Sequence, residues 1–416
     1  MIERSGFSDF TMELEDFEIR KSNMLIDRLH SVTFGGSVHC IPAVMDGVVY
    51  FSSCDYYVYA VDAKNGKRIW DFKTNGMMPG YSPELHENVL YIGTTGKTLY
   101  AIDITTRKSL WEFNAGNAVT TKPLFYKGRI YAGSEDGNLY CVDTDGKEIW
   151  RFTTGKGLFY SVSEHNGKLY FGSGDGYFYC LSLDGKEIWR FKTGDEIYCE
   201  APANFHKGIV YFASVDNYLY AVDAETGKEK WKIPTGKYGN CFSPVIHNDV
   251  IYHGSRDGVL YAFDLDGKEK WRFNAGSLVG VSVTINKDRI YFGCEEGIVF
   301  CLSPEGKEIW RTKVSGPVWC PPVISEGKAY FGSWDCHLYC VNAETGKEIW
   351  SFPTSTQVVS NVDPPYKAWE VEIKKERNDT GNRENAINIE KTGKDEYSME
   401  SEYSVKSEYV MESEYG

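Results

Sequence analysis

The sequence predicts an all-β fold, an eight-bladed β-propeller with four antiparallel strands in each blade. The first observation is a pentapeptide, Gly346 to Trp350, which occurs unchanged at three other places and in looser form at four more. Its tryptophans are 39 to 42 residues apart: Trp70, Trp111, Trp150, Trp189, Trp231, Trp271, Trp310 and Trp350. A repeat near forty residues indicates an array of identical supersecondary units.

The second observation is that each repeat contains four short strand patterns. An apolar run such as 318–324 comes first, and a segment such as 329–331 follows. The third is typified by 139–142, and the fourth carries the tryptophan, as in 150–152. Apolar and polar residues alternate with period two within these runs, and turn residues separate them, which favours strands. Four strands per forty residues are typical of a propeller blade.

The turns explain why the spacing varies. Asp143 to Gly146 places an Asp-Gly pair between the third and fourth strands, as expected for a tight hairpin. Residues 223–227 form a turn that is one residue longer, with glycine at its end. A blade cannot bury both of its faces alone. We therefore expect each tryptophan to pack against the neighbouring blade as a structural docking residue.

One repeat carries a family resemblance. Residues 221–231, Ala-Val-Asp-Ala-Glu-Thr-Gly-Lys-Glu-Lys-Trp, resemble the tryptophan-docking motif of the PQQ-like (quinoprotein dehydrogenase-like) repeat family. Residues 210–216 are similar to that family's second strand and turn, and the likeness extends over about 37–353. The resemblance implies an eight-bladed propeller, and the repeats also resemble propellers of the BamB type.

The same family includes alcohol dehydrogenases that use PQQ and calcium. This sequence has no adjacent cysteine pair and no haem-attachment motif. We therefore expect no cofactor and no enzymatic activity, and we predict a scaffold or binding protein that recognises a protein or ligand through one loop face. The alternative is a PQQ- and calcium-dependent oxidoreductase of the quinoprotein type.

Composition limits the partners. The formal net charge is −14, which disfavours binding to nucleic acid. No apolar run is long enough to span a membrane, and Met1 to Ser8 contain no signal-like apolar segment or lipobox cysteine. We expect a cytoplasmic, monomeric protein.

The cysteines are predicted to be structural. Cys141, Cys180, Cys301 and Cys340 occupy one slot of the repeat, which is alanine in the other four blades. This pattern indicates small buried space-fillers. Two further pairs share slots on the first strands, namely Cys40 with Cys320 and Cys199 with Cys241. A thiol cluster is the alternative for these pairs, and packing is the prediction.

No metal site is predicted. The runs 143–148 and 264–269 place Asp, Asp and Glu with calcium-like spacing, but a hairpin already explains their Asp-Gly pairs. The histidines show no paired metal-binding spacing.

One face is the predicted binding face. Blade topology brings the loops after the second and fourth strands to the same side, and ring closure brings blade 8 beside blade 1. Exposed aromatic and histidine side chains are expected to gather there: His39, Tyr56, Tyr57, Trp319, Trp334 and His337. Such a cluster favours recognition of a protein, peptide or sugar.

The predicted domains are an N-terminal extension (1–36), the propeller (37–373) and a disordered, acidic, tyrosine-rich tail (374–416). The tail repeats Glu-Tyr every six residues, with tyrosine, valine and methionine at odd positions. A conditional β-strand is the alternative interpretation of this tail.

Overall fold

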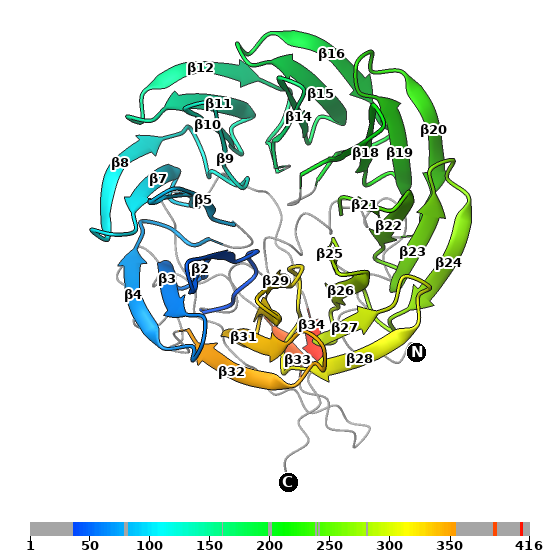
Figure 1. Cartoon of the computed structure of the whole chain (residues 1–416). Helices are drawn as coiled ribbons and strands as arrows, with labels where there is room; N and C mark the ends of the chain where they lie inside the picture. The colour runs from blue at the N-terminus through cyan, green and yellow to red at the C-terminus, as the bar shows by residue number, and fades with distance from the viewer. Residues whose placement is uncertain are drawn as a thin grey trace. The chain divides into compact units, whose positions relative to one another are not determined.

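The structure of the protein is a computed structural model. It describes residues 36–354 apart from 79–81, 160, 199–201, 238, 240–241 and 280–281, together with two short strands near the C-terminus. Figure 1 shows the eight blades around the ring axis, with the outermost strands on the rim. The described residues contain no helix, so none of them forms an apolar helix that could cross a bilayer.

Four strand layers run from the axis to the rim. The innermost strands are β1 (Ala43–Met45), β5 (Glu84–His86), β9 (Leu124–Tyr126), β13 (Ser163–His165), β17 (Asn204–His206), β21 (Val245–His247), β25 (Thr284–Asn286) and β29 (Val323–Ser325). The second strands are β2 (Val48–Ser52), β6 (Val89–Gly93), β10 (Arg129–Gly133), β14 (Lys168–Gly172), β18 (Ile209–Ala213), β22 (Val250–Gly254), β26 (Arg289–Gly293) and β30 (Lys328–Ser333). The third strands are β3 (Tyr57–Asp62), β7 (Thr98–Asp103), β11 (Asn138–Asp143), β15 (Tyr177–Ser182), β19 (Tyr218–Asp223), β23 (Val259–Asp264), β27 (Ile298–Leu302) and β31 (His337–Asn342). The outer strands are β4 (Arg68–Lys73), β8 (Lys108–Asn114), β12 (Glu148–Thr153), β16 (Glu187–Lys192), β20 (Glu229–Pro234), β24 (Glu269–Asn274), β28 (Glu308–Lys313) and β32 (Glu348–Pro353).

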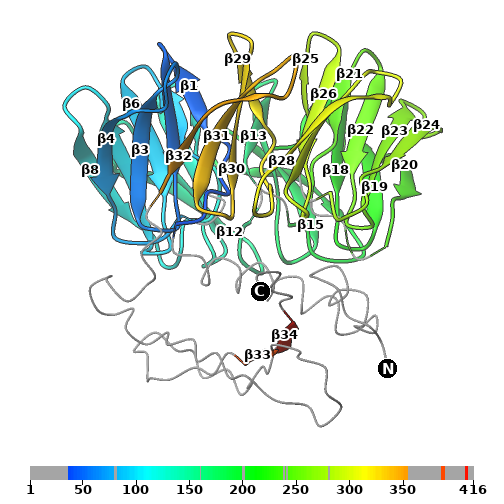
Figure 2. The same ribbon diagram turned by 90° about the horizontal axis from the view of Figure 1, so that it is seen from below.

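Each blade is one continuous stretch of chain, with its four strands paired in sequence order. This confirms the predicted fold class. Among the described strands, none is exchanged between blades 8 and 1, so their contacts are made by side chains and connections. Because the strands alternate in direction, the turns between second and third strands and the connections between blades share one end of the ring. The turns between first and second strands, and between third and fourth strands, occupy the other end, which we call the hairpin-turn end. Figure 2 shows it at the ends of β21, β25 and β29.

The tryptophans dock as predicted. The Trp310 ring lies so close to Gly346 of the next blade that a Cβ there would come within 2.6 Å of it. The indole nitrogens of seven docking tryptophans, from Trp111 to Trp350, donate to a carbonyl in the next blade's turn, as Trp189 Nε1 does to Ala224 O at 3.2 Å. The same pair of contacts closes the ring: Trp350 packs on Gly66 and its Nε1 donates to Ala63 O at 3.2 Å.

A β-bulge in every blade aims the tryptophan at its neighbour. In blade 1, Ala60 pairs with Trp70 but Val61 pairs with Arg68, so Ile69 is the extra residue. The bulged residue points outward, and Ile69 and its apolar counterparts are the exposed large hydrophobic residues of the rim. A bulge turns the strand locally, which here turns the tryptophan onto the blade interface.

The propeller belongs to a compact unit of residues 23–355, and residues 1–22 with 356–416 form a second unit. In the second unit, β33 (Ala386–Asn388) pairs with β34 (Glu408–Val410) in antiparallel fashion. The predicted extension, apart from Gly36, and the predicted end of the propeller at residue 373 lie outside the described residues. The rest of the predicted tail does too.

Candidate functional site

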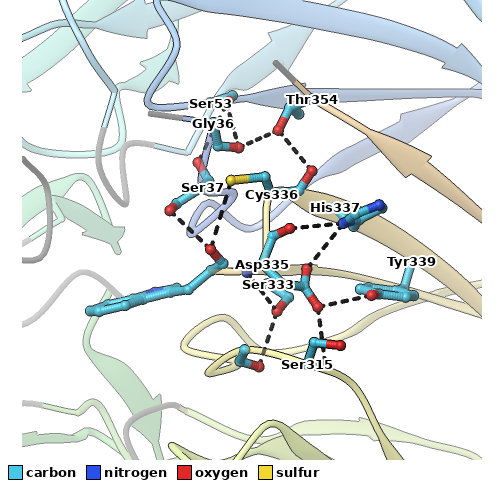
Figure 3. A network of polar contacts seen from close by, with 12 residues as sticks. Gly36, Ser37, Ser53, Ser315, Ser333, Asp335, Cys336, His337, Tyr339 and Thr354 are labelled. Atoms are coloured by element: carbon cyan, nitrogen blue, oxygen red, sulfur yellow. Dashed lines mark hydrogen bonds and ion pairs between the residues drawn. The ribbon is translucent and has the colours of Figure 1, made fainter. Parts of the chain in front are cut away.

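The six residues of the predicted binding face lie in or next to turns and connections of blades 8 and 1, and the rings of His39 and Trp334 meet where the two blades adjoin. We call this region the seam. A polar network joins the two blades there, as Figure 3 shows. Ser37 Oγ donates to Trp334 O at 3.2 Å, and the backbone nitrogen of Val38 donates to Ser333 O at 3.1 Å. Thr354 Oγ1 donates to the carbonyl of Gly36 and to Cys336 O.

The aspartate of the seam belongs to a latch that recurs around the ring. Asp335 accepts hydrogen bonds from Tyr339 OH at 2.8 Å and from the backbone nitrogen of Ser315 at 3.0 Å. His337 Nδ1 lies 2.8 Å from the carbonyl oxygen of Asp335 and 3.4 Å from its carboxylate. The same aspartate–tyrosine pair occurs in five other blades, for example Asp175 with Tyr179 at 2.7 Å. Because the pair recurs in most blades, it stabilises the turn and does not by itself mark a catalytic site.

Trp334 is the centre of an aromatic stack. Its ring lies 4.5 Å from the His39 ring at an angle of 15° and 4.7 Å from the Trp319 ring. Trp334 is only 5% exposed and His39 only 8%. Burial lowers the pKa of His39 to about 3, so its imidazole stays neutral.

The prediction that this whole cluster is exposed was wrong for Trp334, His39 and Tyr56, all of which are buried. The reason is that the connection into blade 1 crosses over the β30–β31 turn and places His39 on the Trp334 ring. Tyr56 is held in the left-handed region, with a φ of 75°, at a position where four of the eight blades have glycine. Tyr57, Trp319 and His337 remain partly exposed.

Sequence reasoning missed a buried carboxylate on the same side of the ring. Glu295, in the β26–β27 turn, is 7% exposed, and burial raises its pKa to about 8. The charge of Glu296 adds to this rise, and the charge of Arg256 in the preceding blade opposes it. The signal in the sequence was Cys294-Glu295-Glu296-Gly297, where six other blades have Ser-x-Asp at the first three positions.

The four cysteines of the repeat slot are fully buried, as predicted. Burial raises the pKa of Cys141 to about 12, which keeps its thiol protonated. Cys40 bonds to both backbone polar groups of Ser52, the last residue of β2. Its Sγ donates to Ser52 O at 3.3 Å and accepts from Ser52 N at 3.2 Å. Cys320 has the same relation to Gly332, and Cys199 and Cys241 lie outside the described residues.

The carboxylates with calcium-like spacing already have partners. Asp143 Oδ1 accepts the backbone nitrogens of Asp145 and Lys147 at 2.9 and 2.8 Å. Glu148 receives two hydrogen bonds from Arg151. The run at 264–269 repeats this arrangement. These residues build a hairpin turn and a surface ion pair. Within the described part of the chain, no three His, Cys, Asp or Glu side chains are grouped to hold a metal ion.

A known protein family matches most of the propeller. The family described as outer membrane protein assembly factor BamB matches residues 54–163, 135–256, 174–318 and 295–380. None of the curated protein sequences matches the chain.

Solved structures share the fold at low identity. BamB from Moraxella catarrhalis is 18% identical, with a TM-score of 0.63, over 71% of this chain and 94% of that one. The computationally designed protein Ika8 is 15% identical, with a TM-score of 0.64, over 77% and 98%. The quinohemoprotein alcohol dehydrogenase ADHIIG from Pseudomonas putida HK5 is 16% identical, with a TM-score of 0.59, over 74% and 70%. The overlapping family matches span most of the chain, which therefore belongs to the BamB family of PQQ-like β-propellers.

Proposed function

We propose that this protein is a non-enzymatic scaffold that binds a protein partner through the loop face at the seam. The observation that carries the proposal is the aromatic stack, in which the partly exposed Trp319 ring lies against a buried Trp334. Interface hot spots are enriched in tryptophan and tyrosine held on rigid supports. Tyr57 and His337, also partly exposed, extend the same surface on blades 1 and 8.

The family supports a protein partner, since BamB is by name an assembly factor for outer membrane proteins. The net charge of −14 favours a protein over a nucleic acid as the partner. We further propose that the protein is monomeric and cytoplasmic. The nine cysteines within the described residues are all free thiols, which agrees with a reducing compartment.

Affinity purification from the native cell tests the proposal, with quantification of every captured protein. We expect Trp319→Ala, and separately a Tyr57→Ser/His337→Ala variant, to lose the same captured protein. Ile309→Ala is the matched control, because this residue is 45% exposed on the rim, away from the loop face. Undiminished capture by both loop-face variants would disprove the proposal, provided that each retains the wild-type melting temperature.

The alternative, a PQQ- and calcium-dependent oxidoreductase, can be tested in the same preparation. A ligand that binds only the native state raises the melting temperature by mass action. We expect PQQ with calcium to leave it unchanged. A rise that saturates with PQQ would overturn the scaffold proposal.

A further inference from the structure

A pocket of about 530 Å³ opens between blades 6 and 7, at the hairpin-turn end of the ring. It is thus at the opposite end of the blades from the loop face. The rings of Tyr252 and Trp271 line it together with two small side chains, Val250 and Pro304. Two carboxylates, Asp288 and Glu305, also line it.

The chain fills the equivalent groove between blades 3 and 4 with one of its own arginines. Arg129 begins β10, and its guanidinium donates to Leu183 O at 2.8 Å in the next blade's turn. The same guanidinium lies 3.5 Å from the carboxylate of Asp184. Between blades 7 and 8, Arg289 reaches the carbonyl of Glu344 at 3.2 Å in the same way.

Between blades 6 and 7 the acceptors are present, but the arginine is not. Val250 begins β22, in the slot that Arg129 has in β10. Pro304 and Glu305 precede Gly306 as Leu183 and Asp184 precede Gly185. Pro304 O accepts Trp271 Nε1 at 2.9 Å, just as Leu183 O accepts Trp150 Nε1 at 3.1 Å in addition to Arg129. The Glu305 carboxylate accepts Ser303 Oγ at 2.7 Å. By sequence position, this carbonyl and this carboxylate correspond to the two groups that receive a guanidinium between blades 3 and 4.

Two other grooves without an arginine are filled differently. Between blades 5 and 6, Leu265 packs into the cluster around Trp231 and Ile233. Between blades 2 and 3, the ring of His86 stacks on Phe125 with 3.7 Å between the ring centres. Neither device fills the pocket, where Pro304 stands in the slot of Leu265 and Ile285 in that of Phe125.

The electrostatics of the two grooves are opposite. Burial raises the pKa of Tyr131 to about 12, and the positive charge of Arg129 opposes that rise. Burial also raises the pKa of Tyr252, but there the charges of Glu305 and Asp288 raise it further. The pocket therefore has a negative potential that a cation would neutralise.

Three further polar residues line the pocket, namely His247, Asn248 and Lys270. His247 Nε2 lies 3.1 Å from Asp288 Oδ1, and Asn248 Nδ2 donates to the same oxygen at 3.3 Å. Both contacts orient the Asp288 carboxylate. Lys270 also lines the pocket and is the positive charge against which an incoming cation must compete.

We propose that this pocket binds the guanidinium group of an arginine side chain from a partner protein. The guanidinium takes the place of Arg129, with Pro304 O and the Glu305 carboxylate as acceptors and the Trp271 and Tyr252 rings beside its plane. Arginine suits such a site because its planar fork bonds to a carboxylate and stacks on aromatic faces. This contact is independent of the proposed loop face.

The indole N–H signal of Trp271, identified by its loss in Trp271→Phe, is the readout in the full chain. The probe is N-acetyl-arginine methylamide, and its neutral analogue N-acetyl-citrulline methylamide is the control. We expect a saturable shift with the arginine probe and none with citrulline. Absence of a saturable shift, or an equal shift with both probes, would overturn the proposal.

Variants sharpen the test. Val250→Arg supplies the missing guanidinium in cis and should abolish the response, so a retained shift contradicts the proposal. Glu305→Gln removes one charge-assisted acceptor and should weaken binding about tenfold or more. Lys270→Ile, which copies Ile149 of blade 3, should tighten it.

Two further measurements complete the test. Arg129→Val empties the groove between blades 3 and 4, and the Trp150 signal should then respond to the same probe. Free L-arginine, whose carboxylate is repelled by Asp288, should bind more weakly than the blocked probe. Tighter binding of the free amino acid would assign the site to a small metabolite and overturn a protein partner.

Discussion

The seam between blades 8 and 1 and the interface between blades 4 and 5 use the same docking device. Trp350 Nε1 donates to Ala63 O across 287 residues, and Trp189 Nε1 donates to Ala224 O across 35, both at 3.2 Å. The geometry of the contact is therefore independent of whether the two blades are consecutive in the chain. Ring closure follows from the same repeat that joins every other pair of blades.

The two interfaces differ on the loop face. In the turn between its second and third strands, blade 4 has Gly174 where blade 8 has Trp334. Both residues donate the same backbone hydrogen bond, at 3.0 Å, to the connection that enters their own blade. A short connection keeps blades 4 and 5 close, so little chain entropy is lost when they pack together. Blades 8 and 1 are not consecutive in the chain and have no such connection. The Trp334 stack adds apolar contact at the one interface that lacks chain continuity.

Loss of a docking tryptophan should have the largest effect, and this effect should be greater at the seam than between blades 4 and 5. Trp350 is 8% exposed, so Trp350→Ala should cost about 3–5 kcal/mol of unfolding free energy. Trp189→Ala should cost less, because Trp189 is only partly buried. Urea denaturation measures both, and an equal or larger cost for Trp189 would remove the distinction between the two interfaces.

Trp334→Ala tests the stack itself. Because Trp334 is buried between His39 and Trp319, the variant should lose about 3 kcal/mol. Val215→Ala, at the equivalent turn of blade 5, is the matched control and should lose about 1 kcal/mol or slightly more. A melting temperature unchanged by Trp334→Ala would show that the stack does not contribute to closing the ring.

Acid should weaken the seam through His39. Its pKa falls from 6.5 to about 3 in the folded state because burial disfavours the imidazolium. The contribution of the neutral imidazole is therefore complete above pH 6.5 and is lost as the pH falls from 6.5 toward 3. The expected slope is about 1.4 kcal/mol per pH unit.

A second buried histidine separates a seam effect from a general one. His253 of blade 6 is fully buried, and burial lowers its pKa to about 4, so it should lose stability between pH 6.5 and 4. Denaturation at several pH values gives the slope of unfolding free energy against pH. This slope should fall by the equivalent of one bound proton in His39→Phe, and by the same amount in His253→Phe. Five other blades have phenylalanine in the slot of His253. Unchanged slopes in both variants would show that neither imidazole is kept neutral by the fold.

The smallest effect concerns how tightly each tryptophan meets its glycine. A Cβ on Gly346 would lie 2.6 Å from Trp310, whereas one on Gly267 would lie 3.5 Å from Trp231. Both glycines have positive φ, so both alanine variants share a backbone cost of about 1 kcal/mol. Gly346→Ala should cost about 1–2 kcal/mol more than Gly267→Ala. Equal melting temperatures for the two variants would mean that the Trp310 ring moves aside for the added methyl group without loss of stability.

The sequence alone determined the fold, because the information is periodic and local. The recurrence of Gly-Lys-Glu-Ile-Trp gave the number of blades, and period-two alternation gave their four strands. The docking role of the tryptophans followed, since a residue repeated in every unit faces the same neighbour in every unit. The buried cysteines were predicted for the same reason, by their common slot with alanine.

Only the tertiary structure decided the candidate sites, because these depend on residues that break the period and on contacts between distant segments. Trp334 is buried because Val38 and His39, almost 300 residues earlier, cross over its turn. The pocket between blades 6 and 7 exists because two small residues, Val250 and Pro304, face each other across one interface. Each substitution looks unremarkable within its own repeat. Its effect appears only when neighbouring blades are packed together, because exposure and electrostatic potential depend on everything nearby in space.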